Sequence, residues 1–267
     1  MAATDRRFTL PSGAKTRLYR GRVIAPSAPL KATPKTSVSL DTELIFGQGF
    51  DVYAEAGAWL LGRAVPLVPS KRKAYVGYVP KRMIAADTVR TAHVVSTVSA
   101  PVFKRADIKS PLMSVLPMNA KIRLEKGEGP LREIAGLGFI HTAHVRCVKN
   151  AAPQDFVDVA TEFLGRPYIW GGTGQVGVDC SGLVQMALAA TGVDAPRDAD
   201  QQEAHLGAVT ALDTALRGDL VFWAGHVGIM EDAKTLLHAN AHHMQVAREP
   251  LKKAIQRIGP PRILKRL

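Results

Sequence analysis

The chain has 267 residues, 46% hydrophobic and 22% charged, with a formal net charge of +12. This composition is typical of a folded protein with ample apolar material for a core, and the length predicts about two domains or three small ones. It excludes a largely disordered chain, and because no run of 18 apolar residues occurs we expect no transmembrane helix.

The positive charge is concentrated in the first part of the chain. Residues 1–150 carry 24 Lys and Arg against 10 Asp and Glu, whereas residues 151–267 carry 11 against 13. This asymmetry favours an anionic partner for the basic N-terminal half, set against a merely solvated surface. No recognition helix or aromatic RNP-like run occurs, so we expect no nucleic-acid partner.

The first residues lack the features of a targeting segment. Met1 to Phe8 contain an acid and two arginines, with no apolar stretch or cleavage pattern behind them. We therefore expect a cytoplasmic protein without a membrane contact. Residues 1–25 are predicted to be basic and irregular, followed by an extended lead-in through Pro26, Pro29 and Pro34, with strands beginning at about Leu44.

Short alternating apolar runs separated by glycines then follow one another. They occupy residues 44–79 and, in a second set, residues 93–148. This pattern predicts two small all-β barrels, at 26–90 and 91–150, the second a diverged copy of the first. Cys147 alternates with Val145 in one such run, which favours a packing role over a disulfide with Cys180.

The hydrophobic pattern of the sequence changes at Ala151, from short strand-like runs to helical periodicity. Residues 153–165 have the periodicity of an amphipathic helix that ends at Gly165, and later apolar runs at 220–223, 226–230 and 236–240 predict antiparallel strands. The domain boundary is therefore placed at Asn150, and residues 151–267 are predicted to form an α+β catalytic domain.

A glycine-rich stretch at residues 168–185 leads into a predicted helix. Asp179 is a good N-cap, apolar residues follow at helical spacing, and Gly192 stands where the helix would end. Cys180 is thereby placed in the first turn, where backbone N–H groups and the helix dipole favour a nucleophilic thiolate.

Two histidines complete a candidate catalytic set. His226 begins one predicted strand and His238 lies on the next, and neighbouring antiparallel strands bring such residues together. His226 would take the proton from Cys180, and His238 would fix its tautomer. His242 and His243 follow, but no zinc-protease motif is present, so we predict no metal and no cofactor.

The motifs of residues 151–250 resemble those of the NlpC family of papain-like bacterial peptidases, over nearly that whole range. The matching segments are Tyr168 to Gly172, Asp179 to Gln185, Pro196-Arg197 with Gln201 or Gln202, Gly218 to Trp223, His226 to Ile229 and His238-Ala239. The N-terminal half is similar to the bacterial SH3-like modules of the same peptidases, closely in the first module and loosely in the second. The fold expected is α+β, with a papain-like domain preceded by two SH3-like barrels.

This resemblance implies a γ-D-glutamyl-L-diamino acid endopeptidase of the dipeptidyl-peptidase VI type, acting on murein peptides. Matched residue by residue, Cys180 is the nucleophile, His226 the base and His238 the orienting third member.

The substrate pocket of that subgroup can be matched as well. Asp179 and Ser181 match residues that hold the free amino group of an N-terminal L-alanine, Tyr168 matches a tyrosine lining the site, and Tyr75 is the candidate for a tyrosine that narrows the cleft. This chain has Gln48 where relatives often carry an acid.

The leading hypothesis is therefore a cytoplasmic cysteine peptidase that hydrolyses the bond between γ-D-glutamate and diaminopimelate or lysine in small, N-terminally free murein peptides during recycling. The alternatives are an exported wall hydrolase acting on intact peptidoglycan, a non-catalytic SH3-like binding protein, and an acyltransferase of the papain-like superfamily.

Overall fold

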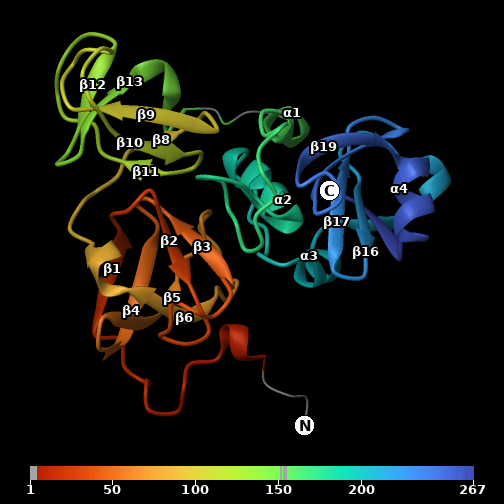
Figure 1. The fold of residues 1–267 in the computed structure, drawn as a ribbon, viewed down its shortest axis with the longest axis horizontal. Coiled ribbons are helices and arrows are strands. Elements are labelled where there is room, and N and C mark those ends of the chain that lie inside the picture. Colours follow the sequence, from red (N-terminus) through yellow and green to blue (C-terminus); the bar gives the residue numbers. More distant parts are fainter. Residues whose placement is uncertain (1–4, 151, 153–154) are drawn as a thin grey trace. The chain divides into compact units, whose positions relative to one another are not determined.

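The computed structural model describes residues 5–150, 152 and 155–267. The chain divides into two compact units, residues 1–151 and 152–267 (Figure 1). This division falls one residue after the predicted boundary at Asn150, and the finer division at residues 25 and 90 stays a prediction. Within the described ranges, every helix is too short or too polar to cross a bilayer.

The first part of the N-terminal unit is an antiparallel five-stranded sheet in the order β6-β5-β4-β1-β7, beside the pair β2-β3. Alternating apolar side chains of these strands pack into a core around Val23, Leu30, Phe50 and Leu60. The elements are η1 (Arg6–Phe8), β1 (Tyr19–Val23), β2 (Ser27–Leu30), β3 (Thr42–Ile45), β4 (Gly49–Ala56), β5 (Trp59–Ala64), β6 (Val76–Pro80), η2 (Lys81–Met83) and β7 (Ile84–Ala86).

Strand β1 contradicts the prediction that residues 1–25 are irregular, as far as residue 5 onward is concerned. It pairs with both β4 and β7, so it lies inside the sheet. Arginines at positions 20 and 22 alternate with the buried Gly21 and Val23, and this basic content hid the period-two pattern. The predicted extended lead-in likewise contains β2. Residues 1–4 of that predicted segment lie outside the described residues.

The second part of the N-terminal unit forms two further antiparallel sheets, β10-β9-β13-β12 and β11-β8-β14. Their inward side chains share a core around Val95, Val102, Leu116 and Ile140. The elements are β8 (His93–Val95), β9 (Ser99–Phe103), β10 (Leu112–Pro117), β11 (Lys121–Ile122), β12 (Leu131–Ile134), β13 (Gly138–His141), η3 (Thr142–His144) and β14 (Val145–Cys147). The likeness of these strand-rich modules to SH3-like barrels stays a prediction.

The C-terminal unit packs helices on a six-stranded antiparallel sheet in the order β15-β20-β16-β17-β18-β19. Helix α2 contacts β17 and β18, while α4 contacts β18 and β19. The elements are α1 (Phe156–Thr161), α2 (Cys180–Ala190), α3 (Ala199–His205), β15 (Ala208–Thr210), η4 (Leu212–Thr214), β16 (Leu220–Trp223), β17 (His226–Met230), β18 (Thr235–Asn240), β19 (Gln245–Pro250), α4 (Leu251–Ile258) and β20 (Ile263–Arg266).

This arrangement confirms the predicted order of a helix followed by antiparallel strands at 220–223, 226–230 and 236–240. Helix α1 is shorter than predicted, because the chain turns after Thr161 and Gly165 adopts a φ of 77°. Residues 153 and 154 of the predicted helix lie outside the described residues.

Candidate active site

The glycine-rich stretch folds back against the first turn of α2. A Cβ atom built on Gly182 would lie 2.3 Å from the carbonyl oxygen of Gly172, and one on Gly177 would lie 2.2 Å from that of Pro167. Both distances are far below a van der Waals contact, so only glycine fits at these close approaches between backbones. The glycines therefore fix the loop that surrounds the start of the helix.

Asp179 is the N-cap of α2, as predicted. Its Oδ1 accepts a hydrogen bond of 2.7 Å from the backbone N–H of Gly182, and its Oδ2 accepts one of 2.8 Å from Gly171. The helix ends at Ala190, with Thr191 as its C-cap and Gly192 next at a φ of 85°. Cys180 is the first helical residue, so the sequence placed it correctly.

The protonation of Cys180 differs from the prediction. Burial raises the pKa of its thiol to about 11, and the neighbouring Asp179 charge acts in the same direction. Backbone N–H groups of Val227 and Ser181 lower the pKa, as expected at a helix N-terminus, but they do not compensate for lost solvation. The prediction of a favoured thiolate is therefore wrong, because a thiol with this raised pKa is neutral at pH 7.

His226 and His238 meet across neighbouring strands, as predicted. His226 Nε2 lies 2.9 Å from His238 Nδ1, and the two rings are 5.2 Å apart between centroids. Burial is the main cause that lowers the pKa of His226 to about 4 and that of His238 to about 3. Both rings are therefore neutral at pH 7, and a neutral His226 can accept a proton. Cys180 lies beside the start of β17. The backbone N–H of Val227, the residue after His226, donates a hydrogen bond to the sulfur of Cys180.

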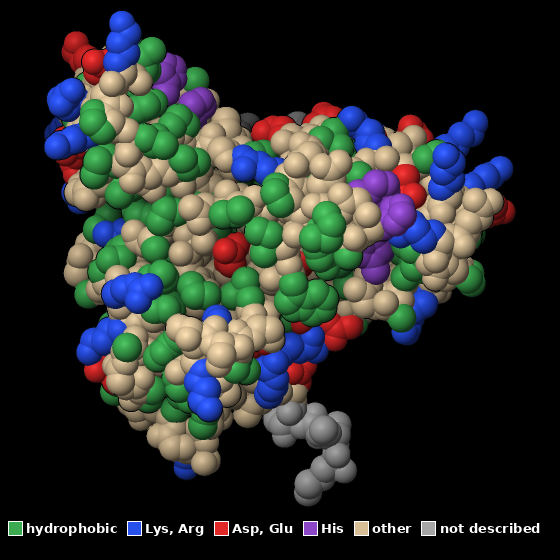
Figure 2. Space-filling view, in the orientation of Figure 1, with side chains coloured by type: hydrophobic (Ala, Val, Ile, Leu, Met, Phe, Trp, Pro, Cys, Tyr) green, Lys and Arg blue, Asp and Glu red, His purple; other side chains and the backbone are tan. Residues whose placement is uncertain are grey.

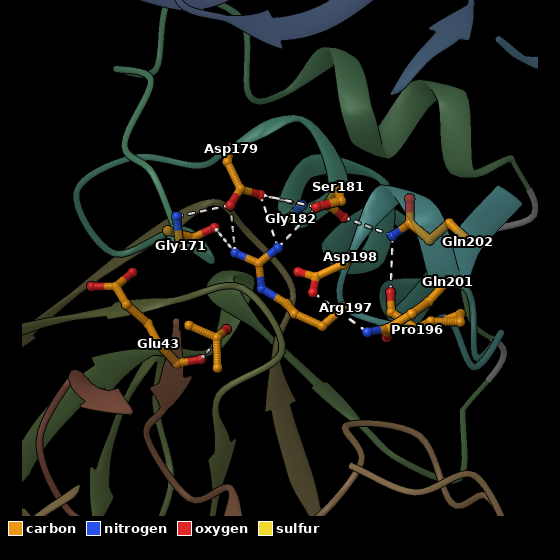
Figure 3. Close-up of polar contacts among 12 residues, drawn as sticks. Glu43, Gly171, Asp179, Ser181, Gly182, Pro196, Arg197, Asp198, Gln201 and Gln202 are labelled. Carbon is orange, nitrogen blue, oxygen red and sulfur yellow. Dashed lines mark hydrogen bonds and ion pairs between the residues drawn. The ribbon is translucent and has the colours of Figure 1, made fainter. Parts of the chain in front are cut away.

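A buried ion pair lies beside the nucleophile. The guanidinium of Arg197 donates two hydrogen bonds to the Asp179 carboxylate, from Nη1 to Oδ1 at 2.9 Å and from Nη2 to Oδ2 at 2.7 Å. Figure 3 shows the guanidinium pointing between Asp179 and Ser181, with Nη1 also donating to Ser181 Oγ at 3.0 Å. Nη2 reaches the carbonyl oxygen of Gly172 at 3.2 Å. Arg197 thus ties together the helix cap, the glycine-rich loop and Ser181.

A second buried side chain, that of Gln202, forms hydrogen bonds with the backbone around Ser181 and Arg197. Gln202 is fully buried on α3 and donates from Nε2 to the carbonyl oxygens of Ser181 and Pro196, both at 2.9 Å (Figure 3). It therefore joins the first turn of α2 to the segment that carries Arg197.

Tyr168 lies close to both Cys180 and Asp179. Burial, together with the charges that these two groups carry when ionised, raises the pKa of Tyr168 to about 12. Its phenol is therefore protonated at neutral pH. Its backbone N–H donates to the carbonyl oxygen of Met244 at 2.9 Å. The C-terminal unit thus brings Tyr168, Asp179, Cys180 and Ser181 together.

The two predicted positions of the N-terminal unit serve that unit's own packing. Tyr75 is 5% exposed in the first core and makes an edge contact with Phe8, at 5.7 Å between ring centroids. Gln48 is buried, accepts a hydrogen bond from the backbone N–H of Ile45 and donates one to the carbonyl oxygen of Val65. A role for Tyr75 in the substrate cleft stays a prediction.

Sequence reasoning missed two partners of the site. Arg197 stood in the quoted Pro196-Arg197 pair, yet nothing in its spacing indicated that it would pair with Asp179. Glu249 was not predicted to belong to the site, although His238 Nε2 lies 2.9 Å from its Oε1. No pattern in the sequence indicated this contact, because it depends on how β19 pairs with β18.

His238, His243 and Glu249 also offer ligand atoms within 4.8 Å of one another. Histidine side chains gather at the surface of the C-terminal unit close to Lys and Arg (Figure 2), and His243 Nδ1 contacts Asn240 Oδ1 at 3.0 Å. Glu249 is ion-paired with Arg257, whose guanidinium disfavours a second cation beside it. We assign no metal to this cluster.

Comparison with known proteins connects this geometry to a family. The NlpC/P60 family model matches residues 165–257, which contain Cys180, His226 and His238. The γ-D-glutamyl-L-lysine dipeptidyl-peptidase of Bacillus subtilis (strain 168) is 30% identical over 218 residues, covering 75% of this chain and 72% of that protein. Dipeptidyl-peptidase 6 of Lysinibacillus sphaericus is 28% identical over 246 residues, covering 82% and 86%.

Among solved structures, an NlpC/P60 family protein from Bacillus cereus ATCC 10987 superposes with a TM-score of 0.79, covering 93% of this chain and 99% of that one. Its identity of 19% makes this a likeness of fold alone. The match to the Bacillus subtilis enzyme, 30% identical over 72% of that protein, carries the assignment of family. The chain belongs to the NlpC/P60 family and is a peptidoglycan-related cysteine endopeptidase.

Proposed function

We propose that this peptidase hydrolyses the bond between γ-D-glutamate and the following diamino acid in small murein peptides with a free N-terminal L-alanine. Cys180 is the nucleophile, His226 the general base and His238 the residue that orients His226. The observation that carries this proposal is the 2.9 Å contact of His226 Nε2 with His238 Nδ1, beside a buried thiol at a helix N-terminus.

The reaction begins from a neutral pair, because burial raises the pKa of Cys180 and lowers that of His226. His226 takes the Sγ proton as the sulfur attacks the γ-carbonyl carbon of D-glutamate, and the positive end of α2 stabilises the developing oxyanion. The C–N bond breaks as His226 returns the proton to the amine of the diamino acid.

A thioester with Cys180 remains after the first product leaves. Water attacks its carbonyl carbon while His226 accepts a proton from that water. The C–S bond then breaks, which releases the L-Ala-γ-D-Glu dipeptide, and the proton on His226 returns to the sulfur. No oxidant, metal or cofactor is consumed in either half of the reaction.

Recognition of the free amine is assigned to Asp179, Ser181 and Tyr168. Asp179 already accepts hydrogen bonds from Gly171, Gly182 and Arg197, so a substrate ammonium has to share its oxygens with the guanidinium. An acylated amine carries no positive charge, so it would lose the charge-assisted hydrogen bonds to this carboxylate, which are typically worth about 1.5 to 3 kcal/mol. The site would therefore reject acylated peptides, and such discrimination suits a cytoplasmic enzyme of peptide recycling.

A second candidate function is hydrolysis of intact peptidoglycan outside the cell. The observation that favours it is the basic N-terminal half, with 24 Lys and Arg against 10 Asp and Glu, which would bind an anionic wall polymer. Stem peptides attached to glycan have no free amine, so this function needs a pocket that accepts blocked substrates.

Substrate competition separates the two functions. The purified full chain is incubated with L-Ala-γ-D-Glu-L-Lys, with the corresponding meso-diaminopimelate peptide, with the N-acetylated form of each, and with intact sacculi. The recycling function predicts cleavage of the free peptides with kcat/KM at least about 10-fold above that for the acetylated ones, because the acetylated peptides lose the charge-assisted hydrogen bonds of the ammonium. Equal cleavage of free and acetylated peptides, with release of material from sacculi, would establish the wall hydrolase instead.

A further inference from the structure

Glu249 lies directly behind the second histidine of the site. Strand β19 pairs with β18 so that His238 stands opposite Ala247, and Glu249, two residues further along, points to the same face of the sheet. His238 Nε2 is 2.9 Å from Glu249 Oε1, and the two side chains are 0% and 10% exposed. A carboxylate is therefore buried against the imidazole of His238, which the proposed reaction needs in one of its two neutral tautomers.

The contact between the two histidines, together with the need for an acceptor nitrogen on His226, determines which tautomer that is. One of the nitrogens 2.9 Å apart has to donate and the other has to accept. If His226 is to take the thiol proton at Nδ1, its own proton must be on Nε2. His238 then accepts at Nδ1, so its single proton must be on Nε2, the atom that faces Glu249.

An ionised carboxylate can only accept hydrogen bonds, so Glu249 favours this tautomer of His238 over the other. Within the described residues Nε2 has no other partner, and the contact is close in distance but outside the angles of an aligned hydrogen bond. The carboxylate is thus the acceptor within reach of Nε2–H. With the opposite tautomer, His238 Nδ1 would donate to His226 Nε2, and the remaining nitrogen of His226 would already carry a proton.

Arg257 on α4 fixes the position of the carboxylate. Its Nη2 donates to Glu249 Oε1, so the acid is held between a guanidinium and the imidazole of His238. Helix α4 follows β19 directly, so both residues of this ion pair belong to the same unit. The partly exposed groove beside it is lined by both residues together with His242, His243, Arg248 and Lys253.

We propose that Glu249 is a positioning residue for the peptidase reaction, which sets the tautomer of His238 and through it the acceptor nitrogen of His226. This inference rests on the proposed function for its role in catalysis. The tautomer itself is a property of the free protein, and it can be measured without any substrate.

The test is ¹⁵N NMR of the full chain labelled at histidine, combined with kinetics on the free tripeptide. In the wild type, His238 is expected to show a protonated Nε2 and an unprotonated Nδ1. Glu249→Ala should give a mixture of tautomers and lower kcat about 10- to 100-fold, by analogy with the loss of a carboxylate partner behind a metal-ligating histidine. KM should change little, because Glu249 does not touch the substrate.

Glu249→Gln retains an acceptor oxygen of the same size, so it should restore the wild-type tautomer and most of kcat. The matched control is Glu231→Ala, which removes the ion pair between Glu231 and Arg248, the neighbour of Glu249 on β19. It should leave the spectrum and kcat unchanged.

The inference is overturned if His238 keeps the same tautomer in Glu249→Ala, or if Glu249→Gln behaves like Glu249→Ala in both measurements. Should Glu249→Ala fail to fold, the wild type alone decides, since a proton on His238 Nδ1 contradicts the proposal. If instead no peptide is cleaved by the wild type, the proposed function fails, while the tautomer measurement still tests the role of Glu249.

Discussion

Arg197 and Asp179 form a bidentate ion pair in which the two side chains are 7% and 11% exposed. The same carboxylate caps α2, so this pair connects the segment before α3 to the helix that carries the nucleophile. A buried charge pair of this kind is strongly destabilising when only one partner is removed, since the other charge stays desolvated.

Arg197→Met should therefore destabilise the C-terminal unit by about 3 kcal/mol, the lower end of the usual range for a broken buried pair. The lower end applies because Gly171 and Gly182 continue to donate to Asp179. Arg197→Lys should recover only part of the loss, since an ammonium cannot reproduce the paired geometry. Scanning calorimetry of the full chain measures the effect.

The matched control for Arg197 is Arg217→Met, which removes an exposed arginine paired with Asp155 and Asp158. Surface pairs contribute about 0 to 1 kcal/mol, so the change in unfolding temperature should be small. Equal destabilisation by the two variants would show that the buried pair has no special role.

Gly182→Ala should abolish most of the activity. The new Cβ would lie 2.3 Å from the carbonyl oxygen of Gly172 and 2.9 Å from Asp179 Oδ1, so the loop has to move away from the helix. Displacing the nucleophile by about 1 Å is expected to cost about 10²-fold in kcat/KM. Gly13→Ala is the control, because nothing lies within 4 Å of its Cβ position. Wild-type kinetics for Gly182→Ala would contradict the close approach.

Alkylation of Cys180 by iodoacetamide should be slow at pH 7 and accelerate as the pH approaches 11. The reason is that burial raises the pKa of the thiol to about 11, so little thiolate is present at neutral pH. Cys147 is free and partly exposed, which makes it an internal reference in the same protein. Peptide mass spectrometry resolves the two sites, and faster labelling of Cys180 than of Cys147 at pH 7 would contradict a neutral thiol.

The stability of the C-terminal unit should decrease as the pH falls from about 6.5, the ordinary histidine pKa. His226 and His238 have pKa values lowered to about 4 and about 3. Between pH 6.5 and pH 4 the unfolded chain binds protons that the folded chain does not, so the free energy of unfolding rises with pH in this window.

His226→Asn combined with His238→Asn should reduce that slope, because neither replacement titrates. Urea unfolding at several pH values measures it, and carboxylates cancel in the comparison with the wild type. An identical slope in the two proteins would rule out the buried neutral histidines as its source.

The sequence predicted the parts of the site that depend on local pattern. Asp179 as N-cap, Cys180 in the first turn, and His226 and His238 on successive strands all follow from spacing within a few residues. Arg197 was missed because it is 18 residues from Asp179 and its pairing depends on tertiary packing. Glu249 depends on the register of β19 against β18, which sequence alone does not give.

The direction of the Cys180 pKa shift was predicted wrongly for a related reason. A helix N-terminus can be recognised in a sequence, but the depth at which it is buried cannot. Strand β1 was missed because its alternating arginines resembled a solvated basic segment, whereas the sheet covers Gly21 and Val23 on the other face.

The most direct test of the account is the identity of the products formed from L-Ala-γ-D-Glu-L-Lys and its meso-diaminopimelate counterpart, measured by mass spectrometry with the wild type and Cys180→Ala. The account predicts L-Ala-γ-D-Glu and the free diamino acid from at least one peptide, and a loss of about 10⁶-fold in rate when the nucleophile is removed. Cleavage at the L-Ala bond, or equal product formation by Cys180→Ala, would contradict it.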